Sequence, residues 1–459
     1  MRMDKESKSL TRMRCTCCHR ALEILRVRSP TAPLSLALSL SLSLPFSWRP
    51  LPSPASSVME KLAVAAIVTV AFFFTLSFSG VESGSNFTGD SSIGGLCPDL
   101  IQRFDYPCSE HKVQTKDGYV LGLHRVSSVA GMLREQRGPP VLLLHGLFMA
   151  GDAWFLGSMN QSLGYILADH GFDVWVGSVR GTRWSHGHVS LSEKDKEFWD
   201  WSWEELALYD LAAMLRYVNL VSNTEVFIVG HSQGTIISLA AFTEPDIVKM
   251  VAGAALLCPI TYLEHVSAPL VLRLVSMHLD QVVLALGIHQ LNFKSDILAE
   301  ILDSVCDGHV DCKDLLTSIT GPNCCLNMSQ VDFFLEYEPH PSSSKNLNHL
   351  FQMIRKGTFA RYDYGRSKNI RRYGQFKPPT FDLSRIPKSL PMWMGYGAND
   401  DLADLMDFQH TLRELESLPE LLYLENYGHV DFLMGVTANR DVYDDMIEFF
   451  RSLLGKSSS

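Results

Sequence analysis

Short apolar runs and helical stretches alternate along most of this chain. Continuous apolar runs occupy 141–146, 173–179, 225–231 and 251–259, and segments such as 203–220, with apolar residues at helical spacing, separate them. Short runs without polar alternation indicate strands that are buried on both faces. Strands joined through helices favour right-handed crossovers and a mostly parallel sheet covered by helices on both faces. The sequence therefore predicts an α/β fold.

A different pattern precedes the first buried run. Within 113–126, two stretches of strand-like composition flank Lys116, Asp117 and Gly118. Asp-Gly is a strong signal for a tight turn between antiparallel strands. We therefore expect a β-hairpin at this point.

The alternation breaks between about 260 and 388. This segment holds helical stretches, polar loops and a group of cysteines, but no convincing buried strand, and strands resume at 391–397 and 421–428. A block inserted between two strands at one edge of a sheet is a natural cover for an active site. We predict a single α/β domain over 96–455, with a cap insertion at about 260–388.

The N-terminal region differs from this body. Residues 62–78 form an apolar run that follows Lys61 and ends in small residues. We interpret 59–79 as a secretory signal peptide cleaved after Ser79. An uncleaved membrane anchor is the alternative, because the run is just long enough to span a bilayer. Residues 80–95 are a Gly/Ser-rich linker.

Residues 1–58 are basic, Ser-rich and low in complexity. They hold nine Lys and Arg against three Asp and Glu, and their Leu-Ser repeats would not pack as a domain. We interpret them as an upstream extension, with translation starting at Met59 and not Met1. A transit peptide for a plastid or mitochondrion is the alternative. The rest of the chain carries 31 basic against 47 acidic residues, which argues against nucleic acid as a partner.

Cysteines and glycosylation motifs bear on the compartment. Cys306, Cys312, Cys324 and Cys325 fall within about twenty residues. Such a cluster indicates disulfides in an oxidising compartment or a zinc site, and the absence of C-x-x-C spacing favours disulfides. The seven cysteines after the signal segment leave at least one free thiol, for which Cys258 in a buried run is the candidate.

Three Asn-x-Ser/Thr motifs would be usable only in the secretory pathway. They begin at Asn86, Asn160 and Asn327. Together with the signal-like segment, they predict a glycoprotein that is secreted or delivered to a lysosome or vacuole.

The strongest chemical motif is G-x-S-x-G at 230–234, with Ser232 at its centre. A strand precedes the motif and a helix follows it, which is the context of a nucleophile on a strained strand-to-helix turn. Glycines two positions away on either side relieve clashes there, and the helix N-terminus favours negative charge. We predict that Ser232 is a catalytic nucleophile.

A serine hydroxyl needs a base, and in this fold the acid and then the histidine follow the serine along the chain. His429 follows the last predicted strand and is the favoured base, whereas His410 lies in a helical stretch and is interpreted as solvated. Asp400 comes first after the preceding strand and is the favoured acid. Asp401 and Asp404 compete with it but suit the first turn of a helix.

An oxyanion hole requires two backbone N–H donors. One belongs to Gln233, the residue after the nucleophile, and Leu147 in the loop after the first buried strand is the candidate for the other. His145 in the same loop is expected to brace the loop and not to act as the base, because it follows a different strand from the one that precedes His429.

These motifs together resemble a known family. VLLLHGLF, GHSQGT, GANDDLAD and NYGHVDF, in this order and spacing, are similar to the acid lipases, which comprise gastric and lysosomal lipases and plant relatives. The resemblance covers roughly 97–450, and residues 1–58 have no counterpart. It implies an α/β-hydrolase core with a helical cap that cleaves triacylglycerols or sterol esters through an acyl-enzyme.

The family's functional residues fall on particular positions of this chain. Its nucleophile, acid and base fall on Ser232, Asp400 and His429, its oxyanion donors on Leu147 and Gln233, and its cap disulfide on Cys306 and Cys312.

The overall expectation is a carboxylic ester hydrolase that needs no metal or organic cofactor and has no obligate protein partner. Its expected substrate is a lipid ester, met at a membrane or lipid-droplet surface. An esterase or acyltransferase for smaller esters is the alternative, followed by a ligand-binding protein on a hydrolase scaffold.

Overall fold

The computed structural model describes residues 95–128, 138–293 and 315–456. The basic extension, the signal-like segment 59–79, Asn86, Cys306 and Cys312 therefore lie outside the described residues. Within the described ranges, no helix is long and apolar enough to cross a membrane.

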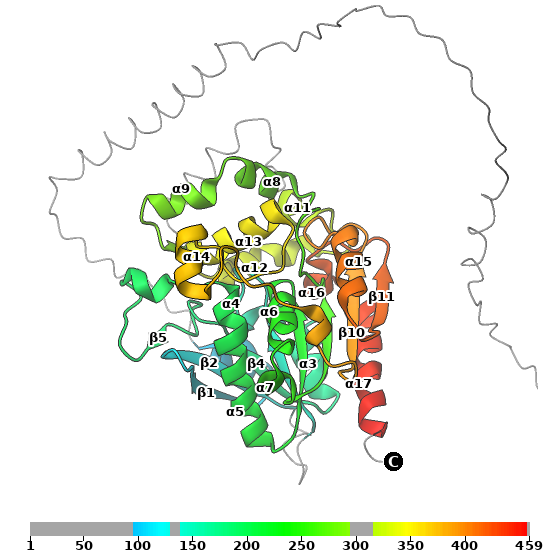
Figure 1. The fold of residues 1–459 in the computed structure, drawn as a ribbon. Coiled ribbons are helices and arrows are strands. Elements are labelled where there is room, and N and C mark those ends of the chain that lie inside the picture. The colour runs from blue at the N-terminus through cyan, green and yellow to red at the C-terminus, as the bar shows by residue number, and fades with distance from the viewer. Residues whose placement is uncertain (1–94, 129–137, 294–314, 457–459) are drawn as a thin grey trace, which may run out of the picture. The chain divides into compact units, whose positions relative to one another are not determined.

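A nine-stranded sheet forms the centre of the described domain (Figure 1). The strands lie side by side in the order β1-β2-β4-β3-β6-β7-β10-β11, and β5 pairs with β2. Neighbours from β4 to β11 run parallel, while β1, β2 and β5 join antiparallel. The strand bounds are β1 Cys108–Gln114, β2 Tyr119–Val126, β3 Pro140–Leu144, β4 Asp173–Gly177, β5 Gly187–His188, β6 Val226–His231, β7 Val251–Leu257, β10 Met392–Gly397 and β11 Glu420–Leu424.

The predicted α/β fold with a mostly parallel sheet is confirmed. All residues of β3, β4 and β6 are buried, as their unbroken apolar sequences indicated. The predicted hairpin is β1–β2, although β1 begins earlier than expected, at Cys108. In the register, Leu144 at the end of β3 lies opposite Gly230 of β6, so the loops that follow these strands meet at one edge of the sheet.

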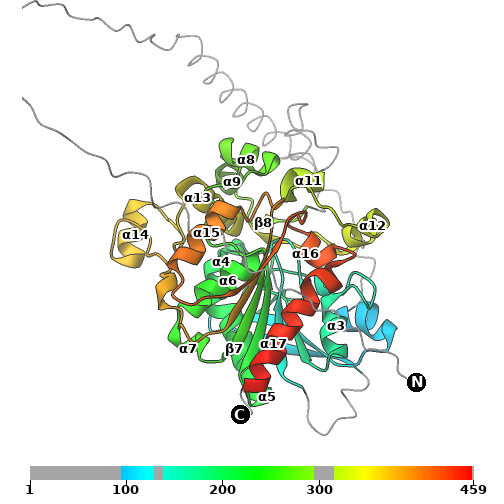
Figure 2. The same ribbon diagram turned by 90° about the vertical axis from the view of Figure 1, so that its right-hand side faces the viewer.

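Helices cover both faces of the sheet. Figure 2 shows α3 and α17 on one side and α4, α6 and α7 on the other. The predicted helix near 203–220 is observed as α4, a π-helical stretch at Leu206–Leu211, and α5. The bounds are α3 Leu163–Asp169, α4 Trp203–Glu205, α5 Ala212–Ser222, α6 Gln233–Phe242, α7 Pro245–Val248, α15 Leu405–Glu414, α16 Asp431–Met434 and α17 Asp444–Lys456.

The chain between β7 and β10 forms the remaining helices, which gather beyond one end of the sheet (Figures 1 and 2). Asn346 in this block donates to the Gln233 side chain at 2.8 Å, so the block lies over the edge where β6 ends. Two strands of two residues each occur here and pair with each other. The bounds are α8 Pro269–Ser276, α9 Leu279–Ala285, β8 Gln290–Leu291, α11 Leu315–Thr320, α12 Met328–Tyr337, β9 Ser342–Ser343, α13 Ser344–Lys356 and α14 Arg366–Tyr373.

Candidate active site

Ser232 stands at the sharp turn between β6 and α6. Its φ of 53° and ψ of −118° are unusual for a residue with a side chain. The flanking glycines make the turn possible: a Cβ on Gly230 would come 2.8 Å from the Gly234 carbonyl oxygen, and one on Gly234 would come 2.3 Å from that of Leu144. The turn therefore needs the glycines at both positions, and it leaves Ser232 only half-buried.

Three side chains from three loops form a hydrogen-bonded line. His429 Nε2 lies 2.7 Å from Ser232 Oγ, and His429 Nδ1 lies 2.8 Å from Asp400 Oδ2. Asp400 follows β10 and His429 follows β11, as the sequence predicted for an acid and a base. With Nδ1 protonated and donating to the carboxylate, Nε2 is the acceptor for the serine proton.

The surroundings of Asp400 favour its ionised form. Burial opposes ionisation, but His429 and the backbone N–H groups of Leu402 and Ala403 hold the pKa of Asp400 below its usual value. Both amides donate to Oδ1, at 2.9 and 2.7 Å. A charged, buried carboxylate is the group required to orient and stabilise a histidine cation.

The competing candidates make other contacts. Asp401 accepts from Ser267 Oγ at 2.7 Å, and Asp404 caps α15 by accepting from the Met406 N–H at 2.7 Å. His410 stacks on the Tyr262 ring with a centroid distance of 3.9 Å. The structure therefore brings only Asp400 and His429, of the acids and bases considered, into line with Ser232.

The two predicted oxyanion donors lie beside the serine. Gln233 is the first residue of α6, and Leu147 lies in the turn after β3, where Gly146 packs against Ser232. Within the described residues, the backbone N–H groups of Leu147 and Gln233 have no hydrogen-bond partner. Two such donors are suited to the negative charge of a tetrahedral intermediate.

His145 braces this loop, as the sequence indicated. Its Nδ1 donates to the Gly146 carbonyl oxygen at 2.9 Å, and its Nε2 accepts the Val179 N–H at 3.1 Å. Burial lowers the pKa of His145 to about 4, so the ring stays neutral in this role.

Two contacts that the sequence did not reveal hold the backbone of His429. His231 Nε2 lies 3.1 Å from the His429 carbonyl oxygen, and Cys258 Sγ donates to the same oxygen at 3.3 Å. Burial lowers the pKa of His231 to about 3, which keeps its ring neutral. The prediction that Cys258 is a free thiol is confirmed, although it lies just after β7 and not within it. Neither contact has a sequence signal, because His231 lies 198 positions and Cys258 lies 171 positions from His429.

The described cysteines form two disulfides. One joins Cys97 to Cys108 and the other joins the neighbours Cys324 and Cys325. The zinc alternative fails for the second pair, because both sulfurs are bonded to each other. Asn160 and Asn327 are both exposed, as a glycosylated residue must be.

One other buried cluster has residue types that can bind a metal. Asp152 of the sheet domain converges with Glu338 and His340 of the cap. His340 donates to Asp152 at 2.8 Å. Burial opposes ionisation of Asp152, but His340 and, to a lesser extent, Arg183 hold its pKa below its usual value. The His340 hydrogen bond and the Arg183 charge thus both stabilise the buried Asp152 carboxylate.

A strand–turn–helix serine at the carboxyl edge of a mostly parallel sheet, in line with a histidine and an acid from later loops, defines the α/β-hydrolase class. Family models agree: one described as alpha/beta hydrolase fold matches residues 139–286, and one described as partial alpha/beta-hydrolase lipase region matches 97–158.

Curated relatives extend along almost the whole described domain. Triacylglycerol lipase 1 of Arabidopsis thaliana is 61% identical over 400 residues, covering 87% of this chain and 100% of that protein. Triacylglycerol lipase 2 of the same plant is 37% identical over 86% of this chain and 99% of its own length. Human lysosomal acid lipase/cholesteryl ester hydrolase is 32% identical, and the match covers 85% of this chain and 99% of that protein. The chain therefore belongs to the acid lipase family of α/β-hydrolases and is an ester hydrolase.

Proposed function

We propose that this chain hydrolyses long-chain acyl esters, above all triacylglycerols, through an acyl-enzyme formed on Ser232. The observation that carries the proposal is the continuous line from Ser232 Oγ through His429 to the Asp400 carboxylate, with spacings of 2.7 and 2.8 Å. Such a line supplies what a serine lacks at neutral pH, a base within reach and an acid that orients it.

The first half of the reaction forms the acyl-enzyme. Ser232 Oγ attacks the ester carbonyl carbon while its proton moves to His429 Nε2, and Asp400 stabilises the resulting imidazolium. The N–H groups of Leu147 and Gln233 donate to the oxyanion. His429 then protonates the alkoxy oxygen, and the alcohol leaves.

The second half returns the enzyme to its starting state. Water replaces the alcohol and gives a proton to His429 Nε2 as it attacks the acyl carbon. The second tetrahedral intermediate collapses, the proton returns to Ser232 Oγ, and the fatty acid leaves.

A lipid substrate fits both the relatives and the cap. The relatives named above are triacylglycerol lipases and an acid lipase/cholesteryl ester hydrolase. Beside the Leu147 loop, Phe148 packs with Phe293 and Leu291 of the cap in a small apolar cluster suited to an acyl chain. Exposed apolar side chains on and beside α8 and α9 provide a surface that could rest on lipid: Leu272, Met277, Val282 and Leu286.

We also propose that the protein enters the secretory pathway and is secreted or reaches a lysosome or vacuole, by way of the signal-like segment 59–79. Two disulfides in the described residues and the exposed Asn160 and Asn327 motifs support an oxidising compartment. Treatment of the cell-derived protein with an N-glycosidase should increase its mobility, and no shift would argue against glycosylation at either site.

The decisive experiment compares wild type with Ser232→Ala on an emulsified long-chain triacylglycerol and on a short-chain p-nitrophenyl ester. We expect the variant to lose both activities by at least about 10³-fold, since no other described hydroxyl is in line with His429. Wild type should release fatty acid from the long-chain substrate.

The other results of this experiment are equally informative. Turnover of the short-chain ester alone would make the chain an esterase. Equal activity of wild type and Ser232→Ala would remove Ser232 as the nucleophile. Ester binding without turnover by wild type would point to a binding scaffold.

A further inference from the structure

The loop that carries His429 is bound along its length to one short segment of the cap, residues 320–326. The His429 N–H donates to the Thr320 carbonyl oxygen at 3.3 Å, and the Val430 N–H donates to Asn323 Oδ1 at 3.3 Å. Further on, the Val436 N–H donates to the Cys325 carbonyl oxygen at 2.8 Å. A cap segment more than 100 residues away in sequence therefore fixes the backbone at the histidine and after it.

Asp431 is the centre of this contact. Its side chain is buried and accepts three backbone N–H groups: Gly428 and Cys324 donate to Oδ2 at 2.8 and 2.9 Å, and Cys325 donates to Oδ1 at 3.0 Å. Gly428 is next to His429, whereas the cysteines belong to the cap. One carboxylate thus ties the histidine loop to the cap segment from both sides.

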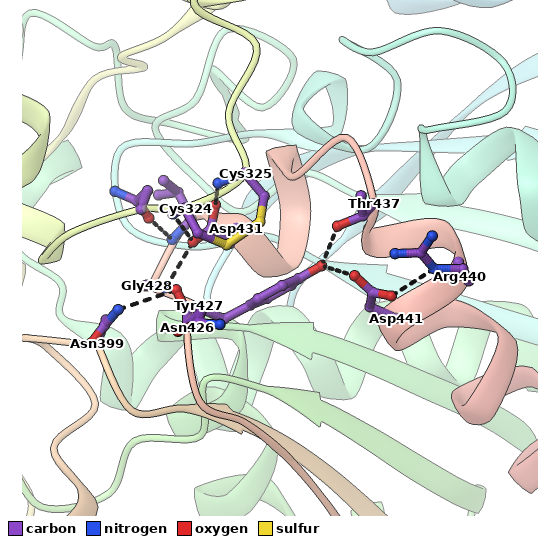
Figure 3. The surroundings of a disulfide bond; sticks show 12 residues. Cys324, Cys325, Asn399, Asn426, Tyr427, Gly428, Asp431, Thr437, Arg440 and Asp441 are labelled. Carbon is purple, nitrogen blue, oxygen red and sulfur yellow. Dashed lines mark hydrogen bonds and ion pairs between the residues drawn. A yellow bond between two sulfur atoms is a disulfide. The ribbon is translucent and has the colours of Figure 1, made fainter.

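The disulfide between Cys324 and Cys325 shapes the cap side of this contact. Figure 3 shows both residues against Asp431, with Gly428 on the same carboxylate. Consecutive amides of an extended chain point in opposite directions, yet here both point to one carboxylate. A covalent ring between adjacent residues restricts the backbone between them, so it keeps the two donors aimed together.

The same segment also contacts the loop of the acid. Gly321 has a φ of +82°, and a Cβ on it would come 2.2 Å from the Asn399 carbonyl oxygen, one residue before Asp400. A Cβ on Gly428 would come 2.6 Å from the Pro322 carbonyl oxygen. Residues 320–326 therefore pack closely against the loops of two of the three aligned side chains.

We propose that Asp431 is a positioning residue for the ester hydrolysis, and that with the Cys324–Cys325 disulfide it forms a clamp that holds His429 in line with Ser232. The proposal rests on the proposed function, because it assumes that His429 is the base. Asp431 does not touch Ser232 or the oxyanion donors, so the clamp acts on the chemical step and not on substrate binding.

Asp431→Asn tests the clamp with almost no change in volume. An amide keeps one acceptor oxygen but places an NH₂ group against a backbone N–H, so at least one of the three hydrogen bonds becomes a repulsion. We expect kcat to fall about tenfold to a hundredfold with KM nearly unchanged, as for a misplaced catalytic group. The fraction of active enzyme is set by titration with a serine-directed phosphonate, so partial unfolding does not enter kcat.

Asp441→Asn is the matched control. Asp441 lies on the other side of Tyr427, accepts its hydroxyl at 3.1 Å and pairs with Arg440. It is a carboxylate of the same neighbourhood without a hydrogen bond to Gly428 or the cysteines. Its removal should leave kcat and KM close to wild type.

The double variant Cys324→Ser/Cys325→Ser tests the disulfide, and it is the second test of the clamp if Asp431→Asn does not fold. It keeps both amides, so kcat should fall less than in Asp431→Asn. Cys324 is exposed, and a phosphine reductant should lower the kcat of wild type toward that of the double variant while leaving the double variant unchanged. This comparison separates the pair from the Cys97–Cys108 disulfide, which both proteins contain.

The low-field proton resonance of the His429–Asp400 hydrogen bond gives a readout that a purely structural role would not move. We expect it to shift or broaden in Asp431→Asn and not in Asp441→Asn. Unchanged kcat in Asp431→Asn, or equal losses in both variants, would overturn the clamp. Ser232→Ala assayed in parallel separates the two proposals: an inactive Ser232→Ala beside a fully active Asp431→Asn contradicts the clamp alone, and an active Ser232→Ala contradicts the proposed function.

Discussion

The serine side and the histidine side of the site are held in different ways. Ser232 is fixed by its immediate neighbours in sequence, the buried strand β6, two glycines and the helix α6. His429 lies in a loop after β11, an edge strand whose residues are exposed or half-buried. Its position depends on residues far away in sequence: His231 and Cys258 on the sheet side, and the segment 320–326 on the cap side.

This difference separates what a short motif can specify from what only the complete fold can specify. The serine turn is formed by steric rules within five residues and by the strand and helix that flank them. The histidine loop has no such local rule and needs cross-chain hydrogen bonds. Substitutions of the glycines that form the serine turn should therefore act through stability, whereas substitutions on the histidine side should also act through catalysis.

The largest effect should come from Asp400→Asn, which disturbs the histidine side at its acid. The side-chain amide of asparagine carries no negative charge to stabilise the His429 cation, and it favours the wrong tautomer of the histidine ring. The kcat should therefore fall by about 10⁴-fold while the fold persists. Steady-state kinetics on a short-chain ester measure this loss. Asp401→Asn, at the next position, is the control, and an equal loss there would mean that the acid has been misassigned.

Gly234→Ala should destabilise the fold at the serine turn. A Cβ there would lie 2.3 Å from a backbone oxygen that cannot move away cheaply, so the free energy of unfolding should fall by about 3 kcal/mol. Urea unfolding followed by tryptophan fluorescence measures it. Gly455→Ala in α17, where a Cβ meets nothing within 4 Å, should not destabilise. A loss below about 1 kcal/mol for Gly234→Ala would contradict the steric account of the turn.

His231→Gln sharpens the comparison through pH. Burial lowers the pKa of His231 to about 3, whereas an unfolded histidine titrates near 6.5. Between these values the unfolded chain binds a proton that the folded chain does not, so stability falls as pH falls. The wild type should therefore lose about 2 kcal/mol more than His231→Gln between pH 7 and pH 5. Unfolding of both proteins at several pH values measures this difference. If their free energies of unfolding change in parallel with pH, His231 does not contribute to the pH dependence of stability.

Asp404→Ala should have the smallest effect. Its carboxylate caps α15 at the Met406 N–H and does not reach His429, so its removal should cost about 1 kcal/mol of stability. The kcat should not change. A large loss of kcat would give Asp404 a part in the acid loop that its contacts do not explain.

The elements that were predicted correctly are those whose signal is local. Unbroken apolar runs predicted the parallel strands, and Asp117-Gly118 predicted the hairpin turn. The order of chain segments after the motif at Ser232 pointed to Asp400 and His429, which the structure brings together, while their catalytic roles remain a proposal. Each of these follows from spacing within a short window or from the order of strands.

The features that the sequence did not predict are contacts without a local sequence signal. The pairing of Cys324 with its neighbour Cys325 was not predicted, because connectivity is not encoded in spacing. The three hydrogen bonds to Asp431 were missed, since their donors lie either three residues away or more than 100. His231 occupies a variable position of the serine motif, where nothing in the pattern indicates that its ring reaches the His429 backbone.

The bridge between Leu326 and Gly435 has a consequence for exchanging caps between related enzymes. The block between β7 and β10 enters and leaves the sheet through two neighbouring strands, but it is not independent of the sheet domain, because Asn346 and His340 bond to Gln233 and Asp152. The stretch around Leu326 is a further tie, since it pairs with the chain just beyond the loop that carries His429. A chimera that imports a foreign cap would have to import both halves of this pairing, or keep both native halves, to remain an active hydrolase.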